Sequence, residues 1–463
     1  MDTQPQPFIP PHPVPRTKPP SRLEVIRTVM RNPLELWGEP SYTMTHIKAS
    51  FINETTVIAN HPELIRHVLV DNAKNYRMAR IRQLILRPIL RDGLLTAEDE
   101  TWKRSRKAMA PVFTPRHIQG FADMMKVRVE EFLDRYRDAP GTHDVSVDMT
   151  ELTYEVLAVT LFSDEVMTEG VDFAEDVDKL LSTMGRVDPL DFIKAPEWMP
   201  RIQRIRGRGV MQKFRDIVRN TMNERRRKMQ ADPDAVKNDF LTLLLNAEGP
   251  DGLSADEIED NLVTFIGAGH ETTARALGWT LYLLANAPHE RAIVEDEISE
   301  VLADEPPPVE WLDRMPKTRA AFEEAMRLYP PAPSINRMAI KDEVFEFSDG
   351  KKLEIDAGNT VLVMPWVLHR HRLYWELPNA FMPKRFWPEN RDKIDRFQYL
   401  PFGVGPRICI GAIFALQEAV IALALLLKEF RFEPAPGLNP WPVQKLTVQA
   451  ENGLPMRVEP RRA

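Results

Sequence analysis

Cysteine is almost absent from this sequence of 463 residues, which contains Cys409 and no other. One cysteine excludes an intrachain disulfide, and it excludes an iron–sulfur cluster, which several thiolates hold. Long apolar runs are also missing. The most apolar stretch, residues 412–427, is interrupted by Gln417 and Glu418 and falls short of the ~20 residues that a membrane-spanning helix needs. We therefore expect no membrane span, and we expect residues 412–427 to form a buried helix.

The sequence also lacks a basic excess, linkers and repeats. With 61 Lys and Arg against 68 Asp and Glu, the net charge is -7, which argues against a general nucleic-acid-binding protein. Residues 40–460 contain no Gly/Ser-rich linker and no repeat, so we expect one large domain over residues 41–463. Eight prolines in the first twenty residues exclude a signal sequence there and predict an extended arm at the start of residues 1–40. We expect a cytoplasmic protein.

Helical patterns dominate what is present. The longest begins at Ser254, which can form a capping box with Glu257, and continues to about residue 285. At about 1.5 Å per residue, such a helix crosses a whole domain. Short strands are predicted within residues 42–59, and a second hairpin around residues 344–355. The predicted fold class is therefore mainly α with small β-sheets.

Cys409 lies in the segment FGVGPRICIG, residues 402–411. A thiolate beneath a haem iron pushes electron density onto the metal and favours O–O cleavage. Gly405 and Gly411 allow turns that let backbone N–H groups point at the sulfur, and Arg407 offers a guanidinium to an anion such as a haem propionate. A lone cysteine is more often a small buried apolar residue than a ligand, and a nucleophilic cysteine is a further alternative, although the segment supplies no base.

The long helix carries the octapeptide IGAGHETT, residues 266–273. A glycine inside a helix costs ~1 kcal/mol relative to alanine, so something other than helix stability favours it. Gly269 would let a ligand approach the backbone, and the Thr272 hydroxyl can bond to the carbonyl of Ala268 and bend the helix. Bound dioxygen fits such an opening, where Glu271 beside Thr272 supplies an acid and a hydroxyl. The alternative is a bent core helix with a solvated carboxylate.

These two segments resemble the haem-binding signature and the oxygen-activation motif of the cytochrome P450 superfamily. The resemblance spans roughly residues 40–460, and it implies a single triangular haem domain with haem b between the long helix and the cysteine loop. It implies that Cys409 is the axial ligand of the iron. The other loop residues that it assigns to the cofactor are Phe402, Arg407 and Gly411.

The reaction that the resemblance implies is a monooxygenation. One atom of O2 enters an organic substrate, Thr272 and Glu271 deliver protons, and Ala268 and Gly269 border the oxygen site. Two rival functions stay open at this point. A haem-thiolate enzyme of this fold can run on peroxide or act as an isomerase, and a non-catalytic carrier of haem or of an apolar ligand would keep the same cysteine.

Two further matches concern the haem propionates. Trp102 and Arg106 are four residues apart on a predicted helix, so their side chains emerge on one face toward a common anion. The resemblance implies that this pair binds one propionate and that Arg337 reaches the other. Taken singly, each arginine is equally well explained as an exposed surface charge.

A third match is architectural. Glu324 and Arg327 share a helix face at the i, i+3 spacing, which by itself is usually a solvated surface contact. They resemble the E-x-x-R element of the family, and Arg385, in the segment MPKRF, resembles its P-x-R-F element. The implied role of Glu324, Arg327 and Arg385 is a structural triad that holds the cysteine side of the fold.

Electrons have to come from another protein, because the chain has no spare cysteine for a cluster and residues 410–463 are too few for a flavin reductase. A separate ferredoxin or flavodoxin with its NAD(P)H-dependent reductase is implied. Lys103, Arg104 and Lys107 form a cationic patch suited to steering an acidic partner, although such a run is as often a solvated face. We expect a monomer.

The substrate is predicted to be lipophilic, because most of the positions that line the pocket in the family are apolar here. The octapeptide and the GLLT segment at residues 93–96 look like the branch that contains fatty-acid and alkyl-chain hydroxylases. The pocket positions map to Phe265, Ile266, Ala268, Ser334, Ile335, Leu446 and Thr447.

Overall fold

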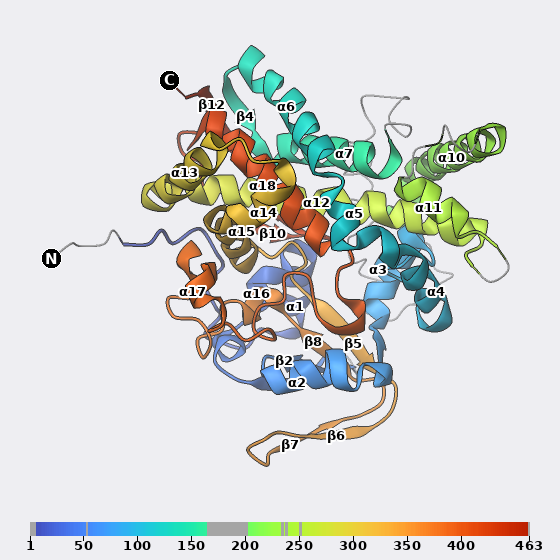
Figure 1. Ribbon diagram of the computed structural model, residues 1–463. Helices are drawn as coiled ribbons and strands as arrows, with labels where there is room; N and C mark the ends of the chain where they lie inside the picture. The colour runs from blue at the N-terminus through green and yellow to red at the C-terminus, as the bar shows by residue number, and fades with distance from the viewer. Residues whose placement is uncertain are drawn as a thin grey trace.

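The computed structural model describes residues 6–51, 54–163, 202–232, 236, 239–249 and 252–461. Most helices gather in one half of the molecule and the largest sheet lies in the other, as Figure 1 shows. The longer helices are α1 (Arg22–Arg31), α3 (Arg80–Leu90), α4 (Asp99–Met109), α6 (Ala122–Asp138), α7 (Val145–Phe162), α10 (Ile202–Ala231), α12 (Ala255–Asn286), α13 (Pro288–Ala303), α15 (Pro316–Leu328) and α18 (Ala412–Glu429). The shorter ones are α2 (Pro62–Arg66), α5 (Pro115–Gln119), α11 (Phe240–Asn246), α14 (Trp311–Arg314), α16 (Pro365–Leu368) and α17 (Pro388–Arg391).

Helix α12 is the long helix that the sequence predicts. Ser254 caps its first turn by accepting from the Glu257 N–H, and the Glu257 carboxylate accepts from the Ser254 N–H in return, so the predicted capping box is confirmed. The helix packs against α7, α10, α15 and α18. The Trp279 ring stacks on Tyr329 at the end of α15, with their centroids 3.7 Å apart. Most side chains of α12 are therefore buried.

The largest sheet has five strands in the order β1-β2-β8-β5-β3. The predicted hairpin forms its edge, with His46 paired to Ala59, but it begins at residue 46 because residues 39–42 form a 3-10 helix. The predicted second hairpin is also present and projects from the molecule in Figure 1. These strands are β1 (His46–Phe51), β2 (Glu54–Ala59), β3 (Tyr76–Met78), β5 (Ile335–Ala339), β8 (Thr360–Val363), β6 (Glu343–Glu346) and β7 (Lys352–Ile355).

Two smaller sheets come from the C-terminal part of the chain, and the first includes one earlier strand. Their orders are β4-β12-β9 and β10-β11. The predicted fold class, mainly α with small β-sheets, is confirmed. The strands are β4 (Gly141–Asp144), β9 (Phe430–Pro434), β10 (Pro442–Gln444), β11 (Val448–Ala450) and β12 (Pro455–Pro460).

Helix α18 follows the cysteine loop and is buried along most of its length, as predicted. Both polar residues that interrupt its apolar sequence are buried as well. The Gln417 side chain donates to the Ile118 carbonyl over 3.2 Å, and Glu418 faces the core. No helix in the described ranges combines the length and the apolar character that crossing a bilayer requires.

The proline-rich start of the chain is extended and is partly inserted into the surface. The Phe381 N–H donates to the Phe8 carbonyl over 2.8 Å, and the Tyr329 hydroxyl donates to the Pro11 carbonyl over 2.7 Å. Proline removes backbone donors, so this arm is fixed by its carbonyl groups and by burial of its rings. The division at residue 41 stays a prediction.

Candidate active site

The cysteine loop is shaped by glycines in left-handed backbone conformations. Gly403 has φ +70° and Gly405 has φ +78°. A Cβ at Gly405 would lie 2.0 Å from the Leu69 carbonyl oxygen, so no other residue fits there. The Cys409 N–H donates to the Phe402 carbonyl over 2.9 Å and closes the loop immediately before α18.

The Cys409 thiol is surrounded by protein and is nevertheless accessible. Burial raises the pKa of the thiol, while a hydrogen bond from the Gly411 backbone N–H and the positive charge of Arg106 lower it. The N–H group and the cation both favour the thiolate form of Cys409. A thiolate with one accessible side is suited to bind a ligand.

An accessible stripe interrupts the buried helix α12. Side chains between Ile258 and Leu284 are buried except at positions 268, 269 and 272. The Thr272 hydroxyl donates to the Ala268 carbonyl over 3.0 Å, as the sequence predicts. The Phe113 ring stacks on Phe265 of α12, and it lies 4.0 Å from the position of a Cβ at Gly411. Phe113 therefore connects the cysteine loop to α12.

Gly269 has a packing reason that the sequence interpretation did not include. A Cβ at this position would lie 3.0 Å from Cδ1 of Leu157 on α7. The glycine therefore lets α7 and α12 approach closely, since a contact of that length is tighter than side chains normally make. Its role at an oxygen site stays a prediction.

Glu271 is buried rather than solvated, so the alternative of a solvated carboxylate is wrong. The Thr447 hydroxyl donates to Oε1 of Glu271 over 2.6 Å. A guanidinium nitrogen of Arg275, one turn along α12, lies 3.9 Å from the same oxygen. The predicted pocket residue Thr447 thus holds the acid that stands beside Thr272 in the chain.

Three of the predicted haem-binding side chains meet at the cysteine loop. The Arg407 guanidinium lies over the Trp102 ring, 4.5 Å from its centroid, and it forms an ion pair with Glu98. It also donates to the Ala97 carbonyl over 2.7 Å. Arg106 donates to the Ile408 carbonyl over 3.0 Å, one residue from the cysteine.

Arg337 carries a partly buried charge with little compensation. In the part of the chain that the structure describes, its guanidinium donates to the Asn336 carbonyl over 3.2 Å and to no carboxylate. Desolvation, together with the like charges of Arg407 and Arg82 and against the opposing charge of Glu98, lowers the pKa of Arg337 to about 10. A buried cation is costly unless an anion pairs with it. An accessible thiol, an accessible stripe on α12 and a cationic cluster fit haem, which brings an iron and two propionates.

Glu324, Arg327 and Arg385 are brought together as the sequence predicts. Glu324 and Arg327 are fully buried and form a bidentate pair with distances of 2.7 and 2.8 Å. The Nε atom of Arg385 lies 3.5 Å from Oε1 of Glu324. The other donors of Arg327 reach the carbonyls of His369, Pro378 and Ala380.

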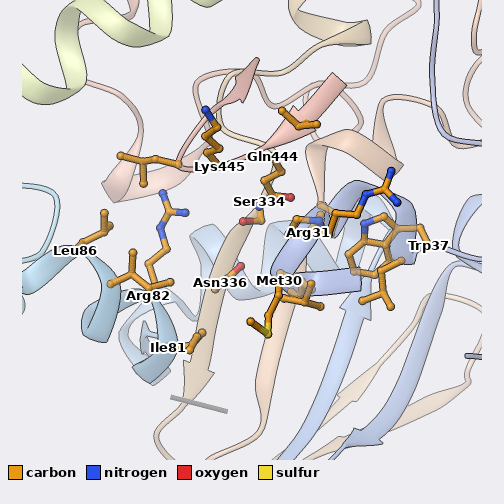
Figure 2. A pocket seen from close by; sticks show the side chains of 18 of the residues that line it. Met30, Arg31, Trp37, Ile81, Arg82, Leu86, Ser334, Asn336, Gln444 and Lys445 are labelled. Atoms are coloured by element: carbon orange, nitrogen blue, oxygen red, sulfur yellow. The ribbon is translucent and has the colours of Figure 1, made fainter. Parts of the chain in front are cut away.

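A cavity of about 700 Å³ lies between α1, α3, β5 and the β10–β11 segment. Figure 2 shows it from close by, with Arg82 reaching in from α3. Two predicted pocket residues, Ser334 and Leu446, line this cavity. Sequence reasoning missed Arg82, because a lone arginine on a short helix carries no motif.

The other predicted pocket residues lie elsewhere. Phe265 and Ile266 are buried in the helical core, and Phe265 stacks between Phe113 and Phe240. Ile335 packs against the sheet-side core, and its Cδ1 lies 3.8 Å from a Cβ built on Gly403. Ser334 lies just before β5 and lines the cavity, whereas Ile335, the first residue of β5, packs against the sheet-side core.

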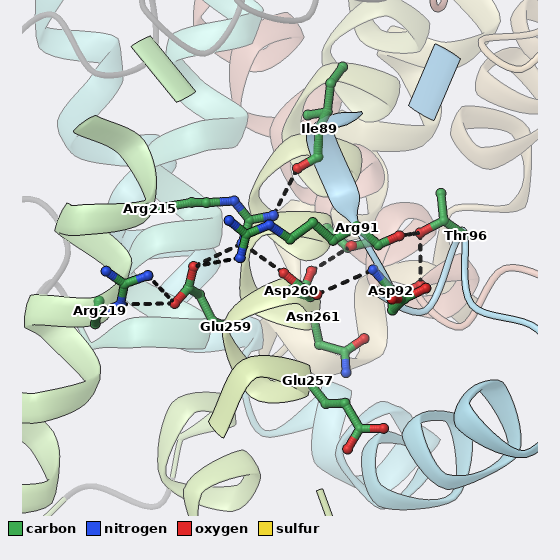
Figure 3. A network of polar contacts seen from close by, with 12 residues as sticks. Ile89, Arg91, Asp92, Thr96, Arg215, Arg219, Glu257, Glu259, Asp260 and Asn261 are labelled. Atoms are coloured by element: carbon green, nitrogen blue, oxygen red, sulfur yellow. Dashed lines mark hydrogen bonds and ion pairs between the residues drawn. The ribbon is translucent and has the colours of Figure 1, made fainter. Parts of the chain in front are cut away.

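A buried network fixes the segment that leads into α4. Arg215 of α10 donates to Glu259 and Asp260 of α12 over 2.8 and 2.7 Å and to the Ile89 carbonyl over 3.0 Å (Figure 3). Asp260 also accepts from the Asp92 N–H over 3.2 Å. The network therefore joins α10, α12 and the α3–α4 segment, and it positions the helix that carries Trp102.

The predicted cationic patch on α4 is partly neutralised. Lys103 pairs with Glu100 over 2.6 Å, and Arg104 pairs with Glu257 at the start of α12 over 2.5 Å. Lys107 is exposed. The net positive charge of the patch is therefore smaller than the sequence suggests.

Comparison with known proteins gives one family. The family model described as Cytochrome P450 matches residues 45–456. The chain is 31% identical to cyclooctatin synthase of Streptomyces melanosporofaciens over 87% of this chain and 85% of that protein. It is 28% identical to pentalenene oxygenase of Streptomyces avermitilis over 94% of each. The crystal structure of cytochrome P450DA heme domain superposes with a TM-score of 0.79 at 26% identity, covering 98% of this chain and 99% of that one.

Proposed function

This chain belongs to the cytochrome P450 family, and from that premise we propose which of its residues carry the family's reaction. The protein is a haem-thiolate monooxygenase that uses haem b and O2. When bound, haem supplies the iron at which O2 is activated. The observation that supports the assignment of residues best is the accessible Cys409 thiol inside a loop that is otherwise closed by protein.

Cys409 would hold the haem iron through its thiolate in this proposal. The Gly411 N–H and the Arg106 charge both favour the thiolate, which supports it. Phe402 and Gly405 shape the loop that presents the sulfur, the first by accepting from the Cys409 N–H and the second by its close approach to Leu69.

The propionates of haem would be held by side chains that the fold already gathers. Trp102, Arg106 and Arg407 meet at the cysteine loop, and Arg337 holds a buried charge nearby. The two propionate carboxylates would neutralise the positive charge of this cluster. Glu98 already supplies one negative charge there, because it pairs with Arg407 and raises the pKa of Arg337. Glu324, Arg327 and Arg385 act as a structural triad rather than in the chemistry.

Protons reach the oxygen site through Thr272 and Glu271. The Thr272 hydroxyl is partly accessible and can exchange its bond to the Ala268 carbonyl for one to a ligand beside α12. Glu271, held by Thr447, stands next to Thr272 in the chain, and in this proposal it relays protons toward that hydroxyl. Ala268 and Gly269 form the accessible backbone of this site. The retained acid and hydroxyl favour O2-dependent turnover over a peroxide-driven or isomerase reaction.

The substrate is a lipophilic organic compound, and an alkyl-chain compound fits the apolar lining of the cavity that contains Ser334 and Leu446. Electrons come from a separate ferredoxin or flavodoxin with an NAD(P)H-dependent reductase. The surface of α4 around Lys107 is the docking face in this proposal, and the paired Lys103 and Arg104 contribute less to steering.

Carbon monoxide binding to the reduced protein tests the ligand. Wild-type protein should give the absorption band from which the family takes its name, and Cys409→His should bind haem but lose that band. A correctly folded, reduced wild-type protein that lacks the band would contradict thiolate ligation. Oxygen and NAD(P)H consumption with surrogate redox partners then separates a monooxygenase from a carrier, because a carrier consumes neither when a ligand is added.

A further inference from the structure

We propose that Arg82 binds the carboxylate of an amphipathic acid, so that the substrate of this enzyme is a lipophilic acid whose acidic group sits in the cavity of Figure 2. The inference deepens the proposed monooxygenase function and rests on it. The carboxylate is recognised in the α1, α3 and β5 cavity, while the apolar body of the acid extends toward α12.

Arg82 is placed to recognise an anion. It stands in the first turn of α3, and Figure 2 shows its side chain directed into the cavity rather than toward solvent. No hydrogen bond or ion pair involves its guanidinium in the described part of the chain. Burial lowers the pKa of Arg82, and no opposite charge offsets that effect. A desolvated cation without a partner is costly, and a carboxylate removes the cost.

The remaining lining selects an apolar body for the acid. Around Arg82 stand aliphatic side chains from three elements, including Met30, Ile85, Leu86 and Leu362. An arginine presents a planar fork that matches both oxygens of a carboxylate, which a lysine cannot do. Arg31, Lys445 and Glu451 also line the cavity, but the aliphatic side chains around the Arg82 fork favour an amphipathic acid over a neutral compound.

One wall of the cavity is continuous in the chain with a residue that contacts α12. Leu446 lines the cavity, and its neighbour Thr447 donates to Glu271 of α12. In this proposal an acid anchored at Arg82 passes Leu446 and places its apolar part near the accessible stripe of α12. The acid group would stay at the cavity and oxidation would occur at a distance from it along the chain.

A second source of carboxylate has to be separated from the first. Arg82 lies near enough to Arg337 to lower its pKa, and Arg337 is a proposed partner of a haem propionate. A propionate and a substrate acid offer the same group to the guanidinium. Removing Arg82 separates the two sources. If the guanidinium binds a propionate, its loss weakens haem binding, and if it binds the substrate acid, its loss weakens acid binding.

The test compares Arg82→Met with a matched control on the same helix, Arg80→Met, whose side chain is exposed. Both are purified with haem, and a long-chain carboxylic acid, its methyl ester and its primary alcohol are titrated while the spin-state shift of the haem absorption is followed. Arg82→Met should weaken acid binding by on the order of tenfold to a hundredfold, as expected for a lost charged hydrogen bond, and leave the ester and alcohol unchanged. Arg80→Met should bind all three like wild type.

Two results would overturn the inference. Equal affinity of wild type and Arg82→Met for the acid removes Arg82 from substrate binding. The other result has two parts. Arg82→Met loses haem during purification or transfers it faster to apomyoglobin, and its affinity for acid, ester and alcohol falls equally. This result would assign Arg82 to a propionate instead. Failure of the proposed function looks different, because then wild-type protein itself would lack the carbon monoxide band.

Discussion

Two arginines in this molecule, one fully and one partly buried, have opposite surroundings. Arg327 has no exposed surface, and its five N–H donors all reach acceptors, two on Glu324 and three on backbone carbonyls. Arg337 is also desolvated, but among the described residues it has one backbone carbonyl, while Arg407 and Arg82 add like charge beside it. The chain completes the first site by folding. The second site needs anions that the chain does not contain.

This difference separates architecture from function in one fold. A satisfied buried ion pair contributes little net stability relative to apolar residues, but removing one partner leaves an unpaired charge and is strongly destabilising. An under-satisfied cation already carries that cost before any mutation. The two arginines should therefore respond to the same substitution with opposite signs.

The largest effect is expected at Arg327. Arg327→Met leaves the Glu324 carboxylate buried without its bidentate partner and should destabilise the protein by about 3–5 kcal/mol, enough to prevent recovery of folded, haem-loaded protein. The yield of soluble protein and the thermal unfolding midpoint measure this. Arg372→Met is the matched control, because Arg372 pairs with Glu39 on the surface and its loss should cost about 1 kcal/mol or less. Equal stability of the two variants would break the comparison.

The second prediction reverses the sign at Arg337. Arg337→Met removes an uncompensated buried charge, so the haem-free protein should be as stable as wild type or more stable, by on the order of 1 kcal/mol. Haem should be retained less well, because a propionate partner is lost. Urea unfolding of apoprotein and the rate of haem transfer to apomyoglobin measure the two parts. An apoprotein destabilised as strongly as Arg327→Met would mean that Arg337 is structural too.

Features that depend on local spacing were predictable from the sequence. The capping box at Ser254, the hairpins and the i, i+3 pair of Glu324 and Arg327 follow from local spacing, so they required no tertiary information. The Thr272 bond to the Ala268 carbonyl is likewise a local i, i−4 contact.

Properties that depend on distant segments were not predictable. Gly269 is needed because Leu157 of α7 approaches it, and Glu271 is held because Thr447 lies beside it. Both contacts join segments that meet only after folding. Ser334 lines the cavity while its neighbour Ile335 packs against the sheet-side core, which a list of pocket positions does not reveal. Arg82 was missed because what distinguishes it is the lack of a partner, and sequence spacing does not report that.

A third prediction compares two threonines of α12 that make the same bond. Thr272 and Thr280 each donate to the carbonyl four residues back, over 3.0 and 2.7 Å, but Thr280 is fully buried and Thr272 is partly accessible. Thr272→Ala should keep its haem, lower product formed per NAD(P)H severalfold and raise hydrogen peroxide, because proton delivery is impaired. Thr280→Ala should change stability slightly and leave coupling unchanged. Unchanged coupling in both variants would remove Thr272 from the mechanism.

The smallest effect is expected at Glu418, which mirrors Arg337 with the opposite charge. This carboxyl is buried in α18, and neither oxygen makes a hydrogen bond of normal geometry within the described chain. Burial raises the pKa of Glu418 well above its ordinary value of 4.5, an effect that the Thr273 hydroxyl offsets only in part. Between those two pKa values the folded protein holds a proton that the unfolded chain has released, so stability falls as pH rises through that window.

Glu418→Gln should abolish this pH-dependent loss, because the amide has no charge to bury. The variant should match wild type well below pH 4.5, where the carboxyl is protonated in both states, and become the more stable protein as pH rises through and above 4.5. Unfolding midpoints of both proteins measured across that range give the difference directly. A variant that is less stable than wild type at every pH would show that the carboxylate has a partner, and Glu418 would then belong with Arg327 among the sites that the chain completes by itself.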